Sequence, residues 1–185
     1  IIQNAFSMCT ECRKYYPEFR VSINLSYVQI LKSPLMMELK QMIDHSGISC
    51  SGIIVELTES GYLEGTPAVR SVWNDMKQLR IQIALDDFGT GYSNLMNISN
   101  LEPDIVKLDR GFTLKALSRS YEYQLMQYVI EMVHKLNQYV CVEGVETKED
   151  LEKIKALGPD LIQGYYYSKP CSRDEFLKKF FDYSE

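Results

Sequence analysis

Short apolar runs alternate with amphipathic helical patterns along the chain, and this alternation most constrains its fold. Runs of strand length are separated by segments whose apolar residues recur at helical spacing. The predicted strands are 20–25, 53–57, 82–85, 105–108, 140–142 and 161–163. The predicted helices are 1–16, 35–43, 67–79, 120–136, 148–157 and 173–181. Strands that alternate with helices in this way form a parallel sheet, either open or closed into a barrel.

The polar residues at the strand ends favour the closed barrel. Each predicted strand brings a polar or charged residue at or near its C-terminal end, while bulky apolar residues fall on its other face. These residues are Asn24, Glu56, Asp86, Lys107, Glu143 and Gln163. Polar or charged residues at the C-terminal ends of all strands are typical of the catalytic mouth of a (β/α)₈ barrel. An open sheet instead binds its ligands at one switch point. The sequence therefore predicts an α/β fold of the TIM-barrel type.

Bulk properties bound the remaining possibilities. The chain has 185 residues, 45% of them hydrophobic, and a net charge of −5, which suits one globular domain and disfavours a nucleic-acid polymer as partner. No apolar run approaches the roughly 20 residues that span a bilayer, so we expect a cytoplasmic domain without membrane contact, even where the parent protein is membrane-anchored. The five cysteines are scattered, which favours a reducing compartment, and Cys9 and Cys12 are read as neighbours on one helix face.

The adjacent acids Asp86 and Asp87 indicate metal chemistry, because a divalent ion is the usual compensation for paired carboxylates. The other oxygen donors near strand ends are Asn24, Glu56, Glu143, Glu146 and Gln163. Without histidine or cysteine among them, Mg²⁺ or Mn²⁺ is favoured over zinc, and so many carboxylates suggest two ions acting on a phosphodiester. Lys107 is expected to orient water or to stabilise charge on a phosphate oxygen.

Structural roles are open alternatives for single acids in this set. An acid at a strand end is commonly a helix cap or a solvated group. One alternative for Glu59 is to hold a loop by accepting hydrogen bonds from backbone N–H groups. The alternative for Asp109 is a simple ion pair with Lys107 or Arg110. Several acids at matched strand positions are harder to explain in this way.

Six segments, taken together, resemble the EAL-type cyclic-di-GMP phosphodiesterase domain. They are SINLS at 22–26, ELTE at 56–59, DDFGTGYS at 86–93, KLD at 107–109, EGVET at 143–147 and QGYY at 163–166. Their order fits the family across nearly the whole chain. The Glu-Ala-Leu signature itself is absent from this sequence. The chain also starts without Met inside a helical pattern, so we expect residues 1–185 to be an EAL domain that lacks its first two strands.

The resemblance implies a modified TIM barrel, two Mg²⁺ or Mn²⁺ ions, and hydrolysis of cyclic di-GMP to linear pGpG in bacterial second-messenger signalling. By motif position it implies metal ligation by Asn24, Glu56, Asp86, Asp87 and Glu143. It also implies that Glu143 is the general base and that Lys107 holds the attacking water. Supporting roles fall to Gln163, Glu146, Asp109 and Glu59, the last as an anchor of the loop after Asp87.

Two other functions stay open beside the enzyme. The domain would be a non-catalytic cyclic-di-GMP receptor if the unseen signature glutamate were replaced, and a protein-interaction domain if it bound no nucleotide. The expected partners are cyclic di-GMP, a second copy of the domain, and sensor or regulatory domains upstream in the parent protein. Turnover by the truncated chain itself is left open.

Overall fold

The computed structural model describes residues 2–26, 28–29, 34–58, 67–90, 98 and 102–181, and these residues form two compact units. The first unit holds the N-terminal elements and the C-terminal helix, and the second holds the elements from the middle of β3 to β6. In chain order the elements are α1 (Ile2–Cys12), β1 (Val21–Leu25), α3 (Leu35–Ser46), η1 (Cys50–Gly52), β2 (Ile53–Thr58), α5 (Pro67–Gln78), β3 (Gln82–Phe88), β4 (Ile105–Leu108), α7 (Arg110–Ser118), α8 (Ser120–Lys135), β5 (Tyr139–Val142), α9 (Lys148–Lys155), β6 (Leu161–Ile162) and α10 (Arg173–Phe181).

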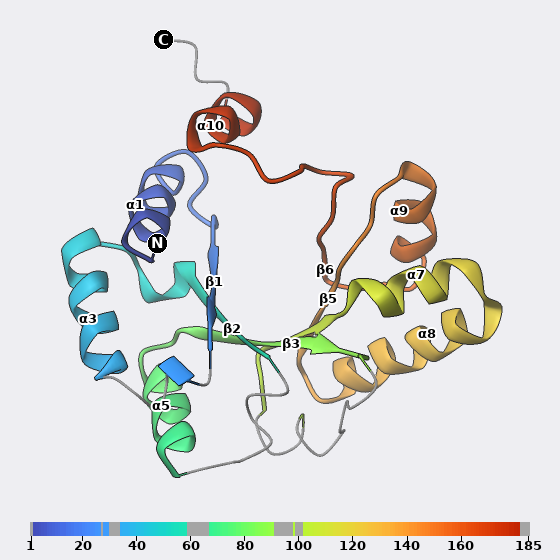
Figure 1. Cartoon of the computed structure of the whole chain (residues 1–185), viewed down its shortest axis with the longest axis horizontal. Helices are drawn as coiled ribbons and strands as arrows, with labels where there is room; N and C mark the ends of the chain where they lie inside the picture. The colour runs from blue at the N-terminus through green and yellow to red at the C-terminus, as the bar shows by residue number, and fades with distance from the viewer. Residues whose placement is uncertain are drawn as a thin grey trace. The chain divides into compact units, whose positions relative to one another are not determined.

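In the first unit, β1 and β2 form a parallel pair that α1, α3 and α5 flank (Figure 1). The register places Asn24 opposite Glu56. Ile23 and Val55 are buried, because alternate residues of a strand point to opposite faces and these two face the helices. Phe6 of α1 and the other fully buried residues of this unit form its core.

The C-terminal helix α10 belongs to the first unit and packs on the segment that follows α1. Phe19 contacts Phe176 and Phe181 of α10, with ring centroids 6.0 Å apart in both pairs. Tyr15 lies at the same centroid distance from Phe181, and Arg173 forms an ion pair with Glu11 of α1. Edge-to-face and tilted aromatic pairs of this kind add to the stabilisation that comes from burial. The two ends of the described chain are therefore joined within one unit.

In the second unit, β3, β4, β5 and β6 pair in parallel and in chain order. Helices α7 and α8 lie against one another and α8 packs on β5 (Figure 1). All four residues of β4 are buried, as expected for a central strand of a parallel sheet covered on both faces. The core is completed by Met126, Ile130 and Val133 of α8 and by Ile154 of α9.

Most predicted elements are confirmed, with shifted ends. The predicted strand 105–108 matches β4, and the predicted helix 173–181 matches α10. The capping box at Ser172 is present, since the Glu175 carboxylate accepts from the Ser172 N–H and the Ser172 hydroxyl accepts from the Glu175 N–H.

Helix α7 was not predicted, because its sequence RGFTLKALS has weak amphipathic periodicity. Its start is set by Asp109, whose Oδ1 accepts from the N–H groups of Gly111 at 2.7 Å and Phe112 at 3.3 Å. A side-chain acceptor at this position satisfies backbone donors that have no partner inside the helix. The described contacts of the Asp109 side chain are these hydrogen bonds at the start of α7, and not the ion pairs with Lys107 or Arg110 that were considered from the sequence.

Cys9 and Cys12 are both buried and neither forms a disulfide. Burial raises the pKa of both thiols, which keeps them in the unreactive neutral form. The Cys9 thiol contacts the carbonyl oxygens of Phe19 and Gly52. The CxxC spacing is therefore a packing feature of α1. Among the described residues, no helix has the length and hydropathy needed to cross a bilayer.

Candidate active site at the strand ends

Lys107 is the centre of the candidate site in the second unit. Lys107 is 4% exposed, and its ammonium group lies 2.9 Å from Asp86 Oδ1 and 2.7 Å from Glu143 Oε1. A buried ammonium group requires compensating negative charge, which the two carboxylates supply. Asp86, Lys107 and Glu143 come from β3, β4 and the end of β5, so the parallel sheet brings three of the predicted residues together.

The acidic pair sits in a β-bulge that the sequence did not reveal. Leu85 pairs with Val106, but the next registered pair is Phe88 with Leu108, so β3 carries one extra residue there. Asp87 takes up this excess with φ of +60°, a left-handed conformation that aspartate tolerates better than most residues. Bulges of this kind redirect side chains next to functional sites. The bulge explains how two consecutive acids are presented at one strand end.

The loop that carries Glu143 and Glu146 is fixed by backbone hydrogen bonds to β4 and to the segment that follows β6. The Glu143 N–H donates to the Leu108 carbonyl at 3.1 Å, which extends the β4–β5 ladder to the site. The Val145 N–H donates to the Gln163 carbonyl at 3.3 Å, and the Val145 carbonyl accepts from Tyr166 at 3.0 Å. These hydrogen bonds hold Gln163 beside the loop that carries Glu143.

Close approach at Gly164 makes this arrangement sensitive to a single methyl group. A Cβ atom at Gly164 would fall well inside van der Waals contact of the Val145 backbone, so Gly164→Ala must separate the two segments. We expect a loss of roughly 3 kcal/mol in the free energy of unfolding, the upper part of the range for overpacking. Urea denaturation measures it. Gly47→Ala is the matched control, since a Cβ there meets no atom and costs only the strain of a left-handed residue. Equal losses in both variants would contradict this account of Gly164.

A cavity of about 390 Å³ opens beside Glu143. Arg110 and Glu146 both line it, and Arg110 donates to Glu146 Oε1 from Nη2 at 2.7 Å and from Nε at 3.2 Å. This hydrogen bond raises the pKa of Arg110 above its usual value. The remaining lining residues are Glu143, Gly144, Gln163, Gly164 and Tyr165. The cavity thus combines two carboxylates, an amide, a guanidinium and an aromatic ring, and one of the carboxylates, Glu143, forms the ion pair with Lys107.

A second group of predicted residues lies in the first unit. Asn24 and Glu56 lie side by side in the β1–β2 register, and Glu56 is 8% exposed. The Ser22 hydroxyl donates to Glu56 Oε1, a contact that sequence reasoning missed, although Ser22 shares a strand face with Asn24. Glu59 lies outside the described residues.

The chemistry of these residues fits a hard divalent cation. Amide and carboxylate oxygens are the ligands that Mg²⁺ and Mn²⁺ prefer. Asp86 Oδ1 is buried and makes no hydrogen bond of good geometry, so its described contact is the ion pair with Lys107. Among the described residues, no three acidic, histidine or cysteine side chains gather closely enough to hold a metal ion. In the second unit the Lys107 ammonium group supplies positive charge to two of the predicted ligands.

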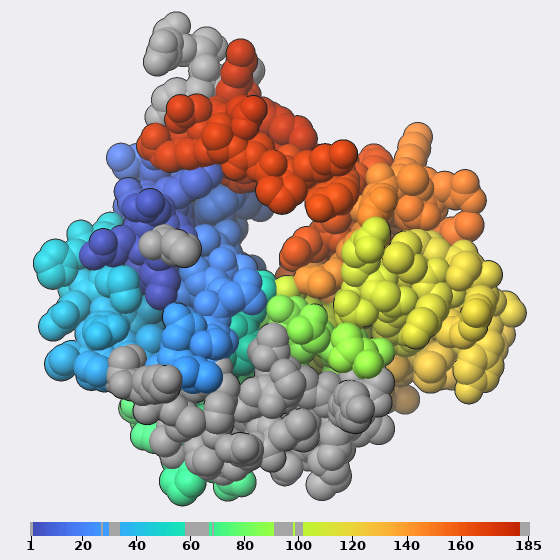
Figure 2. Space-filling model, in the orientation of Figure 1, coloured from blue at the N-terminus to red at the C-terminus, as the bar shows by residue number. Residues whose placement is uncertain are grey.

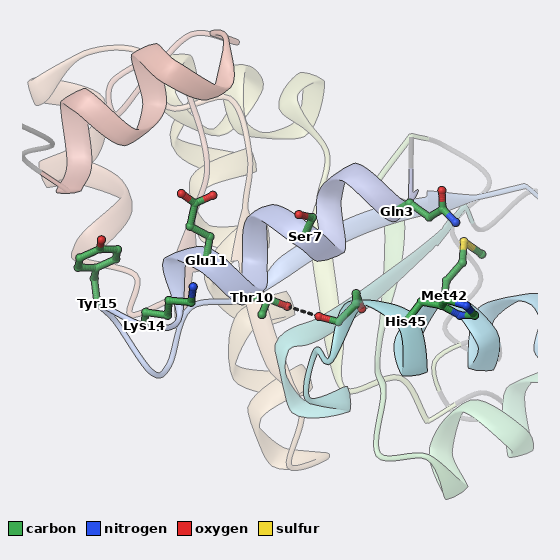
Figure 3. Close-up of a pocket in the computed structure, with 9 residues that line it drawn as sticks. Gln3, Ser7, Thr10, Glu11, Lys14, Tyr15, Met42 and His45 are labelled. Atoms are coloured by element: carbon green, nitrogen blue, oxygen red, sulfur yellow. Dashed lines mark hydrogen bonds between the residues drawn. The ribbon is translucent and has the colours of Figure 1, made fainter. Parts of the chain in front are cut away.

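A different cavity, of about 500 Å³, lies between α1 and α3 (Figure 3). The Thr10 hydroxyl donates to the Ser46 carbonyl at 3.2 Å across this space. Its other lining residues are Gln3, Ser7, Glu11, Lys14, Tyr15, Met42 and His45. None of the predicted site residues borders it, so we place the chemistry at the strand ends.

Comparison with known proteins gives the family. The sequence matches the EAL domain family over residues 1–170, and the chain belongs to this family. It is 31% identical over 170 residues to the cyclic di-GMP phosphodiesterase PdeF of Escherichia coli (strain K12), an alignment covering 92% of this chain and 23% of PdeF. For the cyclic di-GMP phosphodiesterase PdeL of the same organism, the identity is 29%, over 87% of this chain and 44% of PdeL. The chain therefore spans less than half the length of these curated relatives.

Solved structures confirm the fold. The EAL enzyme Bd1971, in a form with cAMP and cyclic di-GMP bound, matches with a TM-score of 0.89 and 28% identity, over 97% of this chain and 50% of that one. The EAL domain of Mycobacterium smegmatis DcpA matches with a TM-score of 0.89 and 24% identity, over 98% of this chain and 82% of that one. The fold is accordingly that of the EAL domain, a modified α/β barrel of the TIM type, as the sequence predicted.

Proposed function

We propose that this chain forms the catalytic part of a metal-dependent phosphodiesterase that hydrolyses cyclic di-GMP to linear pGpG. Membership of the EAL family and the names of the curated relatives support the substrate class. The observation that carries the proposal is the buried Lys107 ammonium group held by Asp86 and Glu143. An arrangement that places a cation and a carboxylate base together suits the activation of water against a phosphodiester.

We propose Mg²⁺ or Mn²⁺ as the resident ions. BlrP1 of Klebsiella pneumoniae has been solved with manganese and cyclic di-GMP and with calcium and cyclic di-GMP, which supports a divalent ion in this family. In this chain the proposed ligands are Asn24, Glu56, Asp86, Asp87 and Glu143. A bound divalent ion supplies Lewis-acid stabilisation of charge on the phosphate oxygens and lowers the pKa of water.

The protein residues then have separable roles. Glu143 accepts the proton of the attacking water, and Lys107 donates a hydrogen bond that orients this water or stabilises the charge developing at phosphorus. The cavity beside Glu143 receives a polar part of the nucleotide, with Arg110 and Gln163 as hydrogen-bond donors on its rim. Glu146 forms an ion pair with Arg110, and we assign it the role of positioning the Arg110 side chain at this cavity.

The second candidate function is a receptor that binds cyclic di-GMP without cleaving it. The two functions are separated by one pair of measurements on the natural protein that contains this chain. Titration calorimetry measures binding, and chromatography of the nucleotides after incubation with Mn²⁺ measures cleavage. Linear product supports the enzyme, whereas tight binding with intact cyclic nucleotide supports the receptor.

We also propose that a second copy of the domain is a partner, through an exposed stripe on α8. Tyr121 is 74% exposed, Leu125 42% and Tyr128 66%. Their spacing of four and three residues aligns them on one side of the helix, away from the buried Met126 and Ile130. Part of this unit's outer surface is formed by α8, yellow in Figure 2. Large exposed aromatic side chains in a row are typical of an interface.

Tyr128→Glu is expected to shift the protein from dimer to monomer, because two copies would bring like charges together in an apolar contact. Light scattering coupled to size-exclusion chromatography measures the mass of both proteins over a concentration series. Gln127→Glu adds the same charge on a different side of α8 and should leave the dimer intact. A wild-type monomer, or equal dissociation of both variants, would remove the stripe as the interface.

Because the chain spans less than half of its curated relatives, we propose that sensor or regulatory domains accompany it in the natural protein. Since residues 1–170 match the EAL domain family, we propose that residues 1–185 belong to one EAL domain. Tests of function therefore require the natural protein that contains the chain.

A further inference from the structure

The contact between Ser22 and Glu56 has no part in the function proposed so far. The Ser22 hydroxyl on β1 donates to Glu56 Oε1 on β2. Ser22 is not opposite Glu56 in the ladder, since its registered partner is Ile54 and Glu56 pairs with Asn24. The hydrogen bond is therefore diagonal across the strand pair, at a separation that side chains on one face can bridge.

Burial makes this hydrogen bond consequential. Glu56 is one of the few buried charged residues within the described part of the chain, and a buried carboxylate is costly unless its oxygens are hydrogen-bonded. Ser22 itself is exposed, so its hydroxyl is not needed to fill the core. The β1–β2 pair is held by backbone hydrogen bonds and by the buried Ile23 and Val55. The pairing of the two strands therefore does not depend on the hydroxyl at position 22.

We propose that Ser22 is a positioning residue that orients the Glu56 carboxylate for a divalent metal ion. This inference rests on the proposed metal-dependent function and adds a residue to it. A hydroxyl that donates to Oε1 fixes the rotation of the carboxylate about its terminal torsion, which is otherwise broad. Residues that hold metal ligands in this way commonly contribute 10- to 100-fold in metal affinity.

The test is Mn²⁺ affinity in the natural protein, measured by the electron paramagnetic resonance signal of free Mn²⁺ and by titration calorimetry, without nucleotide. Ser22→Ala is expected to weaken Mn²⁺ binding by roughly 10- to 100-fold. Ser22→Thr keeps the hydroxyl and suits a strand, so it should restore binding to near the wild-type value. Ser51→Ala is the matched control, because it removes a hydroxyl of the same unit that contacts Ser49 and not Glu56.

A structural role and a positioning role give different results. Removing the Ser22 donor lowers the melting temperature of the metal-free protein, because the buried Glu56 carboxylate loses a hydrogen bond. With positioning, Ser22→Ala that is still folded binds Mn²⁺ more weakly than the wild type below that temperature, and saturating Mn²⁺ restores most of its turnover. Unchanged Mn²⁺ affinity in Ser22→Ala would overturn the inference while leaving the proposed function intact. Equal weakening in Ser22→Ala and Ser22→Thr would also overturn it. Failure of the wild type to bind Mn²⁺ or to cleave cyclic di-GMP would instead overturn the proposed function.

Discussion

Lys107→Met is expected to lower cyclic di-GMP turnover by roughly 10²- to 10³-fold, the range for loss of a donor that stabilises developing charge, and at the same time to strengthen Mn²⁺ binding. The second effect follows from the ion pairs, because the ammonium group lies within 2.9 Å of two carboxylate oxygens. Methionine has a similar shape but no charge. It leaves Asp86 and Glu143 with an uncompensated negative charge that a divalent ion can neutralise.

The same variant should lose stability only when metal is absent. Breaking a largely buried ion pair by removing one partner costs about 3–5 kcal/mol, and ion binding to the folded state offsets this loss. Thermal unfolding with and without Mn²⁺, together with calorimetric titration, measures both effects. Lys135→Met removes an exposed lysine at the end of α8 and should change neither. If Lys107→Met binds Mn²⁺ more weakly than the wild type, Lys107 does not compete with the metal for these carboxylates.

Glu143→Gln is expected to reduce turnover by at least about 10³-fold, because it removes a proposed proton acceptor and a metal ligand in one isosteric change. The backbone of the loop should be preserved, since the hydrogen bond from the Glu143 N–H to the Leu108 carbonyl does not involve the side chain. Nucleotide chromatography measures the linear product, and calorimetry measures whether cyclic di-GMP still binds.

Glu152→Gln provides the control for this substitution. Glu152 is an exposed residue of α9, so the same loss of charge there should leave turnover at the wild-type level. Retained turnover in Glu143→Gln would rule out Glu143 as the base. Loss of turnover in both variants would point to a general effect of charge or folding.

The sequence predicted the layout of the site because strand periodicity is a simple rule. Residues two apart share a face, so the position of Lys107 at the end of a short apolar run was enough to place it near Asp86 and Glu143. The ion pairs in the second unit confirm that these three residues meet. The buried residues Leu85 and Val142 likewise occupy the opposite face, as predicted.

Other features of the site depend on non-local contacts that a pattern does not contain. The bulge at Asp86 and Asp87 follows from the register against β4, which no local propensity specifies. Helix α7 begins where Asp109 caps it, and its weak periodicity gave no signal. An N-cap aspartate directly before the helix was the available clue.

The hydrogen bond between Ser22 and Glu56 was also beyond the sequence pattern. Periodicity placed Ser22 on the same face as Asn24, but it did not show which neighbour on β2 would accept the hydroxyl proton. The diagonal geometry is set by the register of the two strands. Hydroxyl groups on strands are common and mostly solvated, so the contact became evident only with the burial of Glu56.

The most direct test of the account is cleavage of cyclic di-GMP by the natural protein that contains this chain, assayed with Mg²⁺ or Mn²⁺ and again after chelation. We predict linear pGpG as product, formed only with the metal present and lost in Glu143→Gln. Bound cyclic di-GMP that stays intact under all of these conditions would contradict the enzymatic function and favour the receptor.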